Sequence, residues 1–448
     1  MSKKLWGGRF TKPTDPSVEE FTRSIQYDYK LAKYDILGSI VHVEVLGRAG
    51  YLKPKEVSKI HAALSKIGAG KFSPDLSYED VHSQIQGSLE QKIGGLALKL
   101  HTARSRNDQV VFATKVYCKD KLAEVAVLGE NVVNALKSLA KANNDIIMPG
   151  FTHMQHAQPV YLKDYLGAYI MMLESSIDKV KIAAKDIKLA MGAGAVAGTP
   201  IEAKHYNVSM DKYAKKLGLG LAGLKLEPTK NSIYAVSDRS FVAESLNVTA
   251  IIATHLSRFA EDLIIWSTKE FDFVDIDEAF CTGSSLMPQK KNADALEIIR
   301  GCAGRLYGNR IGFLAIIKGL PLSYNRDMQL DKEPLFDSFE TIIKELKVLK
   351  GLVKTLKFNE DKIASQLEDE SLYATDIVYY LVDKGVAFKT AHTIVGKLIK
   401  YSIDNGIEIK SMTPHELAGF SDKFKSKEIV RLFNPKVSVE SKRSIKRD

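Results

Sequence analysis

The stretch that decides the fold is SDRSFVAESLNVTAIIATHLSRFAEDLIIWS, at residues 237–267. It lies within residues 229–282, which contain neither glycine nor proline. Its seam of small and apolar side chains recurs at alternating steps of four and three, namely at Val242, Leu246, Thr249, Ala253, Leu256, Ala260 and Leu263. That spacing is typical of a helix packed in a bundle and does not fit the period of two of a strand. We therefore predict one helix about 45 Å long, at ~1.5 Å per residue.

Four further stretches without glycine or proline predict other long helices, at residues 104–128, 168–191, 335–350 and 352–384. Glycine and proline gather in the short connections between these stretches, as at helix ends. Alternation with a period of two is scarce, so the sequence predicts an all-α protein with little sheet. Four or five long helices should dominate the middle of the chain.

The distribution of helix lengths predicts three parts: an N-terminal helical domain over 1–110, a central long-helix bundle over 111–360 and a small helical C-terminal domain over 361–448. Long helices with apolar seams usually need partners. We therefore expect a homo-oligomer that is built on a shared bundle.

The composition excludes an intrinsically disordered chain, because 45% of the 448 residues are hydrophobic and 26% are charged. The net charge of +10 is compatible with small anionic substrates, and neither zinc-finger spacing nor an RNP-like aromatic run points to nucleic acid. Three widely separated cysteines do not form a disulfide framework. Without a signal-peptide pattern or a run of ~18 apolar residues, we expect a cytoplasmic protein that does not enter a membrane.

The most informative motif is CTGSSLMPQKKNADALEIIR, at residues 281–300. A Gly-Ser-Ser loop leads through Lys290 and Asn292 into a predicted helix. Backbone N–H groups at such a helix start, beside an ammonium and an amide, can hold carboxylate oxygens. The alternative is a structural loop with a capping asparagine, and spacing alone does not decide between the two.

Two other polar segments stand before predicted helices. The segment MPGFTHMQHAQP, at 148–159, contains Thr152 and His153, and histidine is the side chain best suited to acid–base work near neutral pH. A structural histidine is an equally good interpretation, and no acidic residue or third ligand suggests a metal site. The segment HTARSRNDQV, at 101–110, could hold carboxylates through its arginines and Asn107, although a simple polar helix start explains it as well.

Taken together, these segments resemble the fumarase/aspartase superfamily and, within it, the argininosuccinate lyase family. The superfamily signature GSSxMxxKxN is met at residues 283–292. Four family motifs follow the same order as in the family: LWGGRF at 5–10, SRNDQV at 105–110, THxQxAQP at 152–159 and a YN-D-Q-DKE pattern at 324–333. The chain departs from the family after GAGAVAG, where TPIEAK stands at 199–204.

The resemblance implies a three-domain α-helical subunit whose long helices form a twenty-helix core in a homotetramer. Each active site would gather segments from three subunits. The implied reaction is the reversible elimination of L-arginine from argininosuccinate, leaving fumarate, in arginine biosynthesis and without a cofactor or a metal.

The family pattern also implies roles for individual residues. Ser284 is implied as the base and His153 as its acid partner, with Glu297 orienting His153 and Lys290 stabilising the dianionic intermediate. The implied substrate-binding residues are Ser24, Asp28, Asn107, Thr152, Asn292, Tyr324, Gln329 and Lys332, with His82 and Arg239 as weaker matches.

Three kinds of alternative remain open at this point. Another lyase of the superfamily, such as aspartase, fumarase or adenylosuccinate lyase, would share the signature but not LWGGRF and SRNDQV. A non-catalytic scaffold of the crystallin kind would share the fold. A nucleic-acid binder is a distant third.

Overall fold

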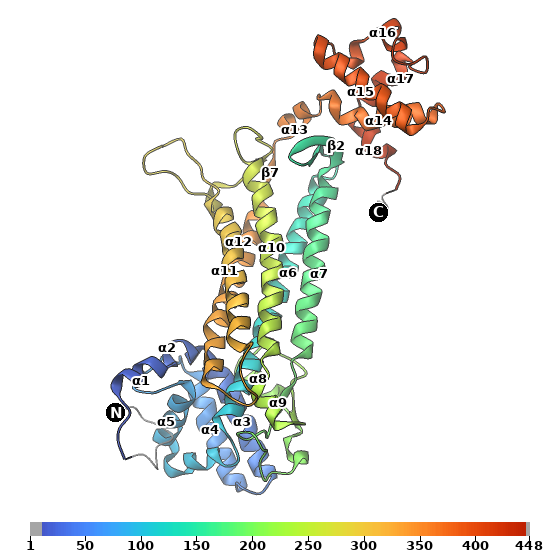
Figure 1. Cartoon of the computed structure of the whole chain (residues 1–448). Coiled ribbons are helices and arrows are strands. Elements are labelled where there is room, and N and C mark those ends of the chain that lie inside the picture. Colours follow the sequence, from blue (N-terminus) through green and yellow to red (C-terminus); the bar gives the residue numbers. More distant parts are fainter. Residues whose placement is uncertain (1–10, 445–448) are drawn as a thin grey trace. The chain divides into compact units, whose positions relative to one another are not determined.

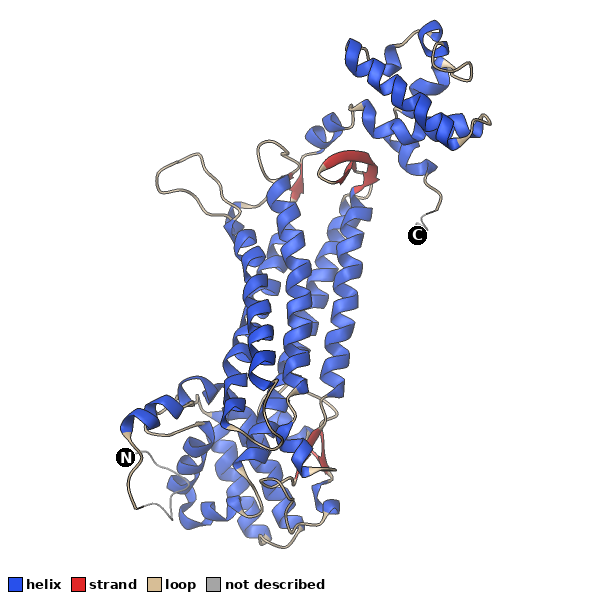
Figure 2. Cartoon of the chain, viewed as in Figure 1, coloured by secondary structure: helices blue, strands red, loops and turns tan. Residues whose placement is uncertain are grey.

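Helices dominate the computed structural model, which describes residues 11–444, and its strands are short (Figure 2). The all-α prediction is confirmed. Five long helices form the centre of the chain (Figure 1): α6 (Arg106–Ala142), α7 (Leu162–Asp186), α10 (Ser240–Trp266), α11 (Asp294–Ile317) and α12 (Lys332–Thr355). The predicted seam of α10 is confirmed, because each of its seven side chains is at most 1% exposed.

Two compact units make up the chain, and each takes three chain segments. The first contains the residues up to Glu130, Ser175–Thr254 and Gly301–Lys347, and the second contains Asn131–Glu174, His255–Arg300 and the residues from Val348 onward. Each of the five long helices contributes residues to both units. The three-domain division at residues 110 and 360 stays a prediction.

Aromatic and charged side chains join the long helices within the first unit. Tyr117 of α6 packs edge-on against Phe336 and Phe339 of α12, with ring centroids 4.9 and 5.8 Å apart. The guanidinium of Arg305 in α11 pairs with Asp337 of α12, its Nε lying 2.8 Å from Oδ2. Such contacts fix the helices laterally over the apolar seam.

The same kind of contact joins the long helices within the second unit. Asp262 of α10 accepts hydrogen bonds from the hydroxyls of Tyr165, at 2.8 Å, and Tyr169, both in α7. Arg300 of α11 lies 2.7 Å from Glu261 of α10. Because these partners lie on different helices, the pairs set the register of one helix against the next.

Shorter elements complete the first unit. A three-stranded sheet has the order β3-β5-β4, with β3 parallel and β4 antiparallel to β5. Its strands and the remaining helices are α1 (Pro16–Thr22), α2 (Ile25–Asp28), η1 (Tyr29–Leu31), α3 (Ala32–Arg48), α4 (Pro54–Ala69), α5 (Val81–Ile93), η2 (Gly94–His101), β3 (Leu189–Met191), η3 (Ala203–Tyr206), β4 (Val208–Ser209), α8 (Asp211–Lys216), β5 (Lys225–Pro228), α9 (Ser232–Ser237) and η5 (Arg326–Asp331).

The C-terminal part of the second unit has its own apolar core, which includes Ile377, Leu381, Val395 and Leu398. Two strands pair antiparallel just before it, β6 (Val274–Asp275) and β7 (Lys357–Phe358). The other elements of this unit are β1 (Ile147–Thr152), β2 (Gln155–Tyr161), η4 (Glu278–Phe280), α13 (Glu360–Gln366), η6 (Glu370–Tyr373), α14 (Ala374–Asp383), α15 (Phe388–Asn405), η7 (Ile409–Ser411), α16 (Pro414–Ala418), α17 (Ser426–Leu432) and α18 (Pro435–Ser441).

Three helix boundaries expected from glycine positions are wrong. Helix α6 continues through Gly129, α7 begins before Gly167 and α12 continues through Gly351. A Cβ at Gly129 would lie 2.9 Å from Ile177, and one at Gly351 would lie 2.8 Å from the Phe280 ring. These glycines permit close packing inside a helix. The stretch 352–384 is likewise not one helix, since β7, α13 and η6 interrupt it.

Candidate active site

His153 lies at the tip of the β1–β2 hairpin, in a turn that does not suit its residues. The strands pair from Ile147 with Tyr161 to Thr152 with Gln155, which leaves a two-residue connection. His153 and Met154 have φ angles of 55° and 60°. Asparagine and glycine usually fill such a turn, because a left-handed residue with a bulky side chain costs roughly 1–2 kcal/mol. Backbone strain of this kind often accompanies function.

Replacing Met154 tests this strain. Met154→Gly should raise the free energy of unfolding by about 1 kcal/mol, because glycine adopts positive φ freely. Met171→Gly is the matched control, since Met171 is also exposed but lies in helix α7, where glycine should lower stability by about 1 kcal/mol. Denaturant titration of both variants should show that the free energy of unfolding changes in opposite directions. A loss of stability in Met154→Gly would contradict the strain.

Side chains outside the predicted set hold this hairpin in place. His156 Nδ1 lies 2.7 Å from Asp369 Oδ2, just before η6. The Phe151 ring packs against His156 on one side and Phe271 on the other, with centroids 5.2 and 5.7 Å apart. His156 occupies a variable position of the THxQxAQP pattern, so the motif gives no sign of this anchor.

The signature residues 283–292 lie in a loop between α10 and α11, which projects beyond the helix ends in Figure 1. Thr282 and Asn292 close the base of the loop by two backbone hydrogen bonds, of 3.1 and 2.8 Å. The Asn292 amide adds a bond to Gly283 O at 3.4 Å. Leu286, beyond this base, is 85% exposed. The loop therefore presents an apolar tip as well as its polar residues.

Ser284 has a distinctive environment within this loop. Its Oγ accepts hydrogen bonds from the backbone N–H groups of Leu286, at 3.2 Å, and Met287, at 3.0 Å. Two amide donors aimed at one hydroxyl oxygen favour negative charge on that oxygen. Lys290 and Glu297 are exposed, and among the described residues no hydrogen bond joins Glu297 to His153.

The other predicted residues lie in the first unit, where several are buried together. Ser24 Oγ donates to Asp28 Oδ2 at 2.6 Å, and the other oxygen of Asp28 accepts from the Val81 amide at 3.0 Å. His82 Nδ1 lies 2.9 Å from Asp35 Oδ1. Ser24, Asp28 and His82 are 2–3% exposed, so they form a buried charge cluster beside the start of α5.

Asp28 and Asp80, two carboxyl groups that interact with the charge of His82, differ in pKa. Burial, together with the negative charge of Asp80, raises the pKa of Asp28 to about 6. Burial also acts on Asp80, but the Arg106 guanidinium and His82 outweigh it and lower the pKa of Asp80 to about 2. Asp80 also caps α5 by accepting from the Ser83 amide at 2.8 Å. Asp28 is thus the member of the cluster that changes charge near pH 6.

This pKa predicts an acid limb in the pH profile. If Asp28 holds the substrate's ammonium group, it must be ionised, so kcat/KM should fall about tenfold per pH unit below pH ~6 and stay level above it. Asp28→Asn should lower kcat/KM above pH ~6. It should also abolish the decrease below pH ~6 that the protonation of Asp28 causes. Steady-state kinetics across this range checks the prediction. An unchanged limb in Asp28→Asn would contradict it.

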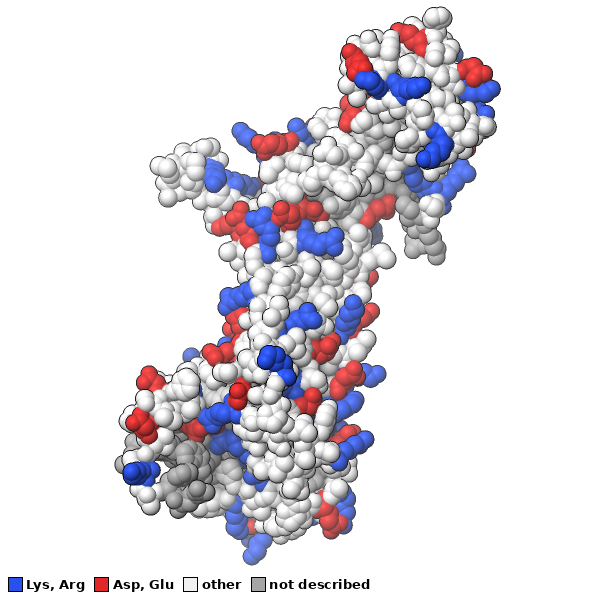
Figure 3. All heavy atoms as spheres, in the orientation of Figure 1, with Lys and Arg blue, Asp and Glu red and all other residues white. Residues whose placement is uncertain are grey.

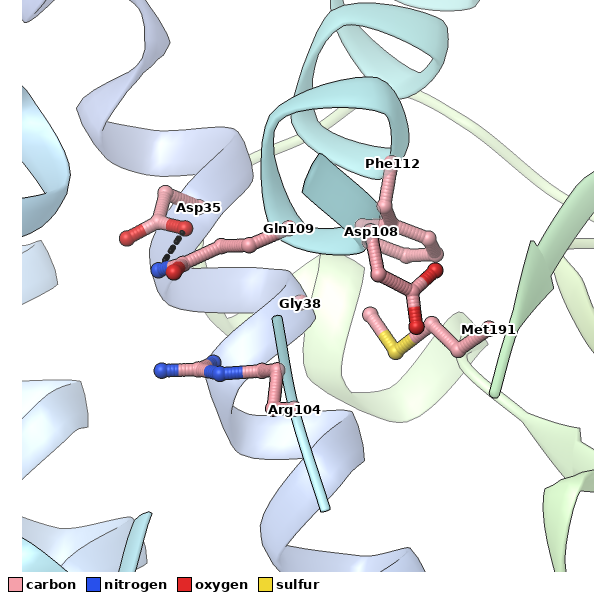
Figure 4. Close-up of a pocket in the computed structure, with 7 residues that line it drawn as sticks. All are labelled: Asp35, Gly38, Arg104, Asp108, Gln109, Phe112 and Met191. Atoms are coloured by element: carbon pink, nitrogen blue, oxygen red, sulfur yellow. Dashed lines mark hydrogen bonds between the residues drawn. The ribbon is translucent and has the colours of Figure 1, made fainter. Parts of the chain in front are cut away.

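Buried polar groups also surround the start of α6 (Figure 4). Gln109 Nε2 donates to Asp35 Oδ1 at 2.7 Å, and an Arg104 amino group donates to Ser39 Oγ at 2.9 Å. Burial lowers the pKa of Arg104 to about 10 and raises that of Asp108 to about 6. The cavity between these residues holds only about 10 Å³, too little for a substrate.

A third group lies where η5 leads into α12. Arg239 Nε is 3.2 Å and Lys332 Nζ is 2.7 Å from the two oxygens of Asp331, and all three side chains are buried. Gln329 Nε2 reaches the hydroxyl of Tyr27 at 3.4 Å. Burial raises the pKa of Tyr324, so its phenol is neutral near pH 7.

The predicted residues thus fall into two sets. Thr152, His153, Ser284, Lys290, Asn292 and Glu297 lie in the second unit, and Ser24, Asp28, His82, Asn107, Arg239, Tyr324, Gln329 and Lys332 lie in the first. The LWGGRF motif, at 5–10, falls outside the described residues. The prediction missed Asp35, whose sequence signal is a lone charge on an otherwise apolar helix face. It also assigned no role to Asp331, although Asp331 lies in the YN-D-Q-DKE pattern.

Two negative findings apply to residues 11–444. No group of three or more His, Cys, Asp or Glu side chains there could hold a metal ion. No helix in this range is both long and apolar enough to cross a membrane.

Comparison with known proteins places the chain in a class and then in a family. A family model described as lyase matches residues 8–308, and one described as argininosuccinate lyase C-terminal matches residues 371–440. Among solved structures, EDDS lyase in complex with formate has a TM-score of 0.77 at 25% identity, covering 95% of this chain and 85% of that one. Class II fumarase from Schistosoma mansoni has a TM-score of 0.79 at 18% identity, covering 92% and 90%. The fold is that of this class of lyases.

Curated relatives narrow the class. Argininosuccinate lyase of Geobacter sulfurreducens is 43% identical over 428 residues, which cover 94% of this chain and 91% of the relative. The enzyme of the same name from Caldanaerobacter subterraneus is 44% identical over 421 residues, covering 94% and 93%. The chain belongs to the argininosuccinate lyase family.

Proposed function

We propose that this chain catalyses the reversible elimination of L-arginine from argininosuccinate, leaving fumarate, with Ser284 as the base. The Ser284 alkoxide takes a proton from the carbon next to a carboxylate, which gives an aci-carboxylate dianion. The electron pair then forms the carbon–carbon double bond of fumarate as the C–N bond breaks. The departing guanidinium nitrogen receives its proton from His153.

The observation that carries this role is the pair of backbone amides at Ser284 Oγ. Serine is a poor base unless its alkoxide is stabilised. The amides of Leu286 and Met287 offer that stabilisation without an added counter-ion. Lys290 stands six residues further along the same exposed loop and supplies a positive charge for the dianion.

The remaining roles are assigned by similarity to the family. Lys290 and Asn292 would stabilise the dianion, and Glu297 would orient His153. Thr152 and Asn107 would bind the succinate carboxylates, while Ser24 and Asp28 would bind the arginine-derived amino-acid end. Tyr324, Gln329, Lys332, His82 and Arg239 would complete the substrate site.

The surface of α11 supports a homotetramer whose twenty-helix core takes five helices from each chain. Tyr307, Ile311 and Leu314 are exposed on this helix, at 38–65%. Cβ atoms added at Gly301, Gly304, Gly308 and Gly312 would meet nothing within 4 Å. The glycines leave few protruding side chains on this exposed apolar face, so it suits close packing against a helix of another copy of the chain. Light scattering should give four times the chain mass of 49.7 kDa, and a monomer would contradict the assembly.

The assembly explains why site residues sit on exposed tips. In the family pattern, each site combines segments of three subunits, so Ser284 would act on a substrate held by other chains. Leu286 and Met287, at 85% and 41% exposure, would then pack against a neighbouring subunit rather than face solvent.

Other aspects of the proposal rest on surface and cysteine chemistry. Lys and Arg side chains are interspersed with Asp and Glu on the face seen in Figure 3, which favours a small-molecule substrate over a nucleic acid. The three cysteines are unpaired, which supports a cytoplasmic location.

Product analysis with a panel of substrates tests the function. Argininosuccinate should give equal amounts of arginine and fumarate, and aspartate, malate and adenylosuccinate should not react. Turnover of one of the latter instead would identify another lyase of the superfamily. Failure with every substrate would favour a scaffold protein.

A further inference from the structure

The loop at residues 192–198, GAGAVAG, follows strand β3 and depends on its glycines for its backbone conformation. Gly192, Gly194 and Gly198 have φ angles of 98°, 59° and 87°, which only glycine adopts without strain. The Gly198 amide donates to Ala193 O at 2.9 Å and closes the loop on itself. A Cβ at Gly194 would lie 2.4 Å from Gly198 O. The backbone of this loop is thus set by its glycines and by its own hydrogen bond.

A buried carboxylate clamps this loop to helix α6. Asp108, which is 6% exposed, accepts a hydrogen bond from the Gly192 amide at 2.9 Å. The neighbouring amides of Ala193 and Gly194 also favour its ionised form, which partly offsets the rise in the pKa of Asp108 that burial causes. Three successive backbone N–H groups around one carboxylate form a nest, and bonds to an ionised acceptor are the stronger kind.

The contact with Asp108 decides whether the GAGAVAG loop could bind the phosphate of a cofactor. Strand β3 directly precedes the glycine-rich loop, as a strand does in dinucleotide-binding loops. The amides of 192–194 are nevertheless taken by Asp108, so they do not offer a phosphate cradle.

The tip of the loop contacts Asn107, which directly precedes Asp108 in α6. Asn107 Nδ2 donates to Ala195 O at 3.4 Å. Because a carbonyl oxygen can only accept, the nitrogen end of the amide must face the loop. The second N–H and the Oδ1 of Asn107 are therefore directed elsewhere, and the side chain is partly exposed.

We propose that the loop 192–198, clamped by Asp108, is a positioning element that sets the orientation of the Asn107 amide and hence the affinity for a substrate carboxylate. The inference rests on the proposed function, in which Asn107 binds the succinate part of the substrate. Asp108 is a positioning residue, since it acts through the loop. Val196, which follows Ala195 in the same loop, is 41% exposed.

Asp108→Asn is the first test. The asparagine side chain keeps one acceptor oxygen, but its NH2 group would face the backbone N–H groups of the loop. Because two donors cannot form a hydrogen bond with each other, the clamp should fail. We expect KM for argininosuccinate to rise about tenfold and kcat to stay within about threefold, the effect of losing one oriented hydrogen bond in substrate binding. Asp211→Asn is the matched control, because Asp211 also accepts a loop amide, that of Leu224 at 2.7 Å, away from Asn107. Its KM should not change.

Val196→Asp is a second test that does not depend on the clamp. A carboxylate beside Asn107 should repel the dicarboxylate substrate and raise KM at least about fivefold at low salt. Val430→Asp is its control, with 49% exposure on α17 in the other unit, and should leave KM unchanged. KM values in Asp108→Asn and Val196→Asp that match their controls would overturn the positioning role. A wild-type chain that releases no fumarate would instead refute the proposed function.

Discussion

Ser284→Ala is expected to lower kcat about 10³-fold while KM changes by less than about threefold. The hydroxyl oxygen is the only atom removed that the two loop amides contact, so the variant loses the base without losing the loop. General base catalysis typically contributes 10²–10⁴-fold, which sets the size of the effect. Fumarate release followed by ultraviolet absorbance measures it directly.

A neighbouring substitution controls for damage to the loop. Gln289 is exposed and occupies a variable position of the signature, so Gln289→Ala should keep near wild-type turnover. Light scattering should give the same mass for both variants. Wild-type turnover in Ser284→Ala would remove Ser284 from the mechanism.

His153→Asn should also lower kcat, by about 10²–10³-fold, because the general acid for the departing nitrogen is lost. Asparagine is the right replacement, since it tolerates the left-handed backbone at the hairpin tip better than other residues without an ionisable ring. The variant should therefore fold at least as stably as the wild type. Steady-state kinetics and thermal unfolding of the same sample separate the two effects.

The adjacent residue provides the matched control. Met154 shares the turn and the positive φ but has no proposed chemical role. Met154→Asn should keep turnover within about threefold. If Met154→Asn were as inactive as His153→Asn, the geometry of the turn rather than the imidazole would explain the loss.

Hydrophobic spacing predicted the long helices well, and glycine positions predicted their ends poorly. The α10 seam repeats over seven positions, so its period is unmistakable and every member is buried. Gly129 and Gly351 marked expected ends, yet both lie inside helices opposite Ile177 and Phe280. A glycine needed for close packing and one needed for a turn look alike in a sequence, because the difference lies in a partner far along the chain.

The β1–β2 hairpin was not predicted for a similar reason. Its tip holds His-Met instead of the usual asparagine and glycine, so the local signal for a two-residue turn is missing. Pro149 and Pro159 face each other in the paired strands and make the segment look like a loop. Anchors such as the pair of His156 and Asp369 stabilise the hairpin, and they are 213 positions apart in sequence.

The sequence indicated the site residues that lie in a contiguous motif, but it did not indicate the charged residues that are buried within helices. The signature 283–292 identified the loop that holds Ser284. Asp35 lies on an apolar helix face without any motif. Asp108 lies within SRNDQV, but the motif assigns it no role of its own. Only the contacts of these two residues with His82 and Gly192 indicate what they do.

The most direct test of the central claim is a mixture of inactive Ser284→Ala and inactive His153→Asn chains, unfolded and reassembled together at equal amounts. If each site takes Ser284 from one subunit and His153 from another, random assortment leaves both residues intact in about a quarter of the sites. The mixture should then recover about a quarter of wild-type turnover. Activity no higher than that of the separate variants, in tetramers of the right mass, would contradict a site shared between chains.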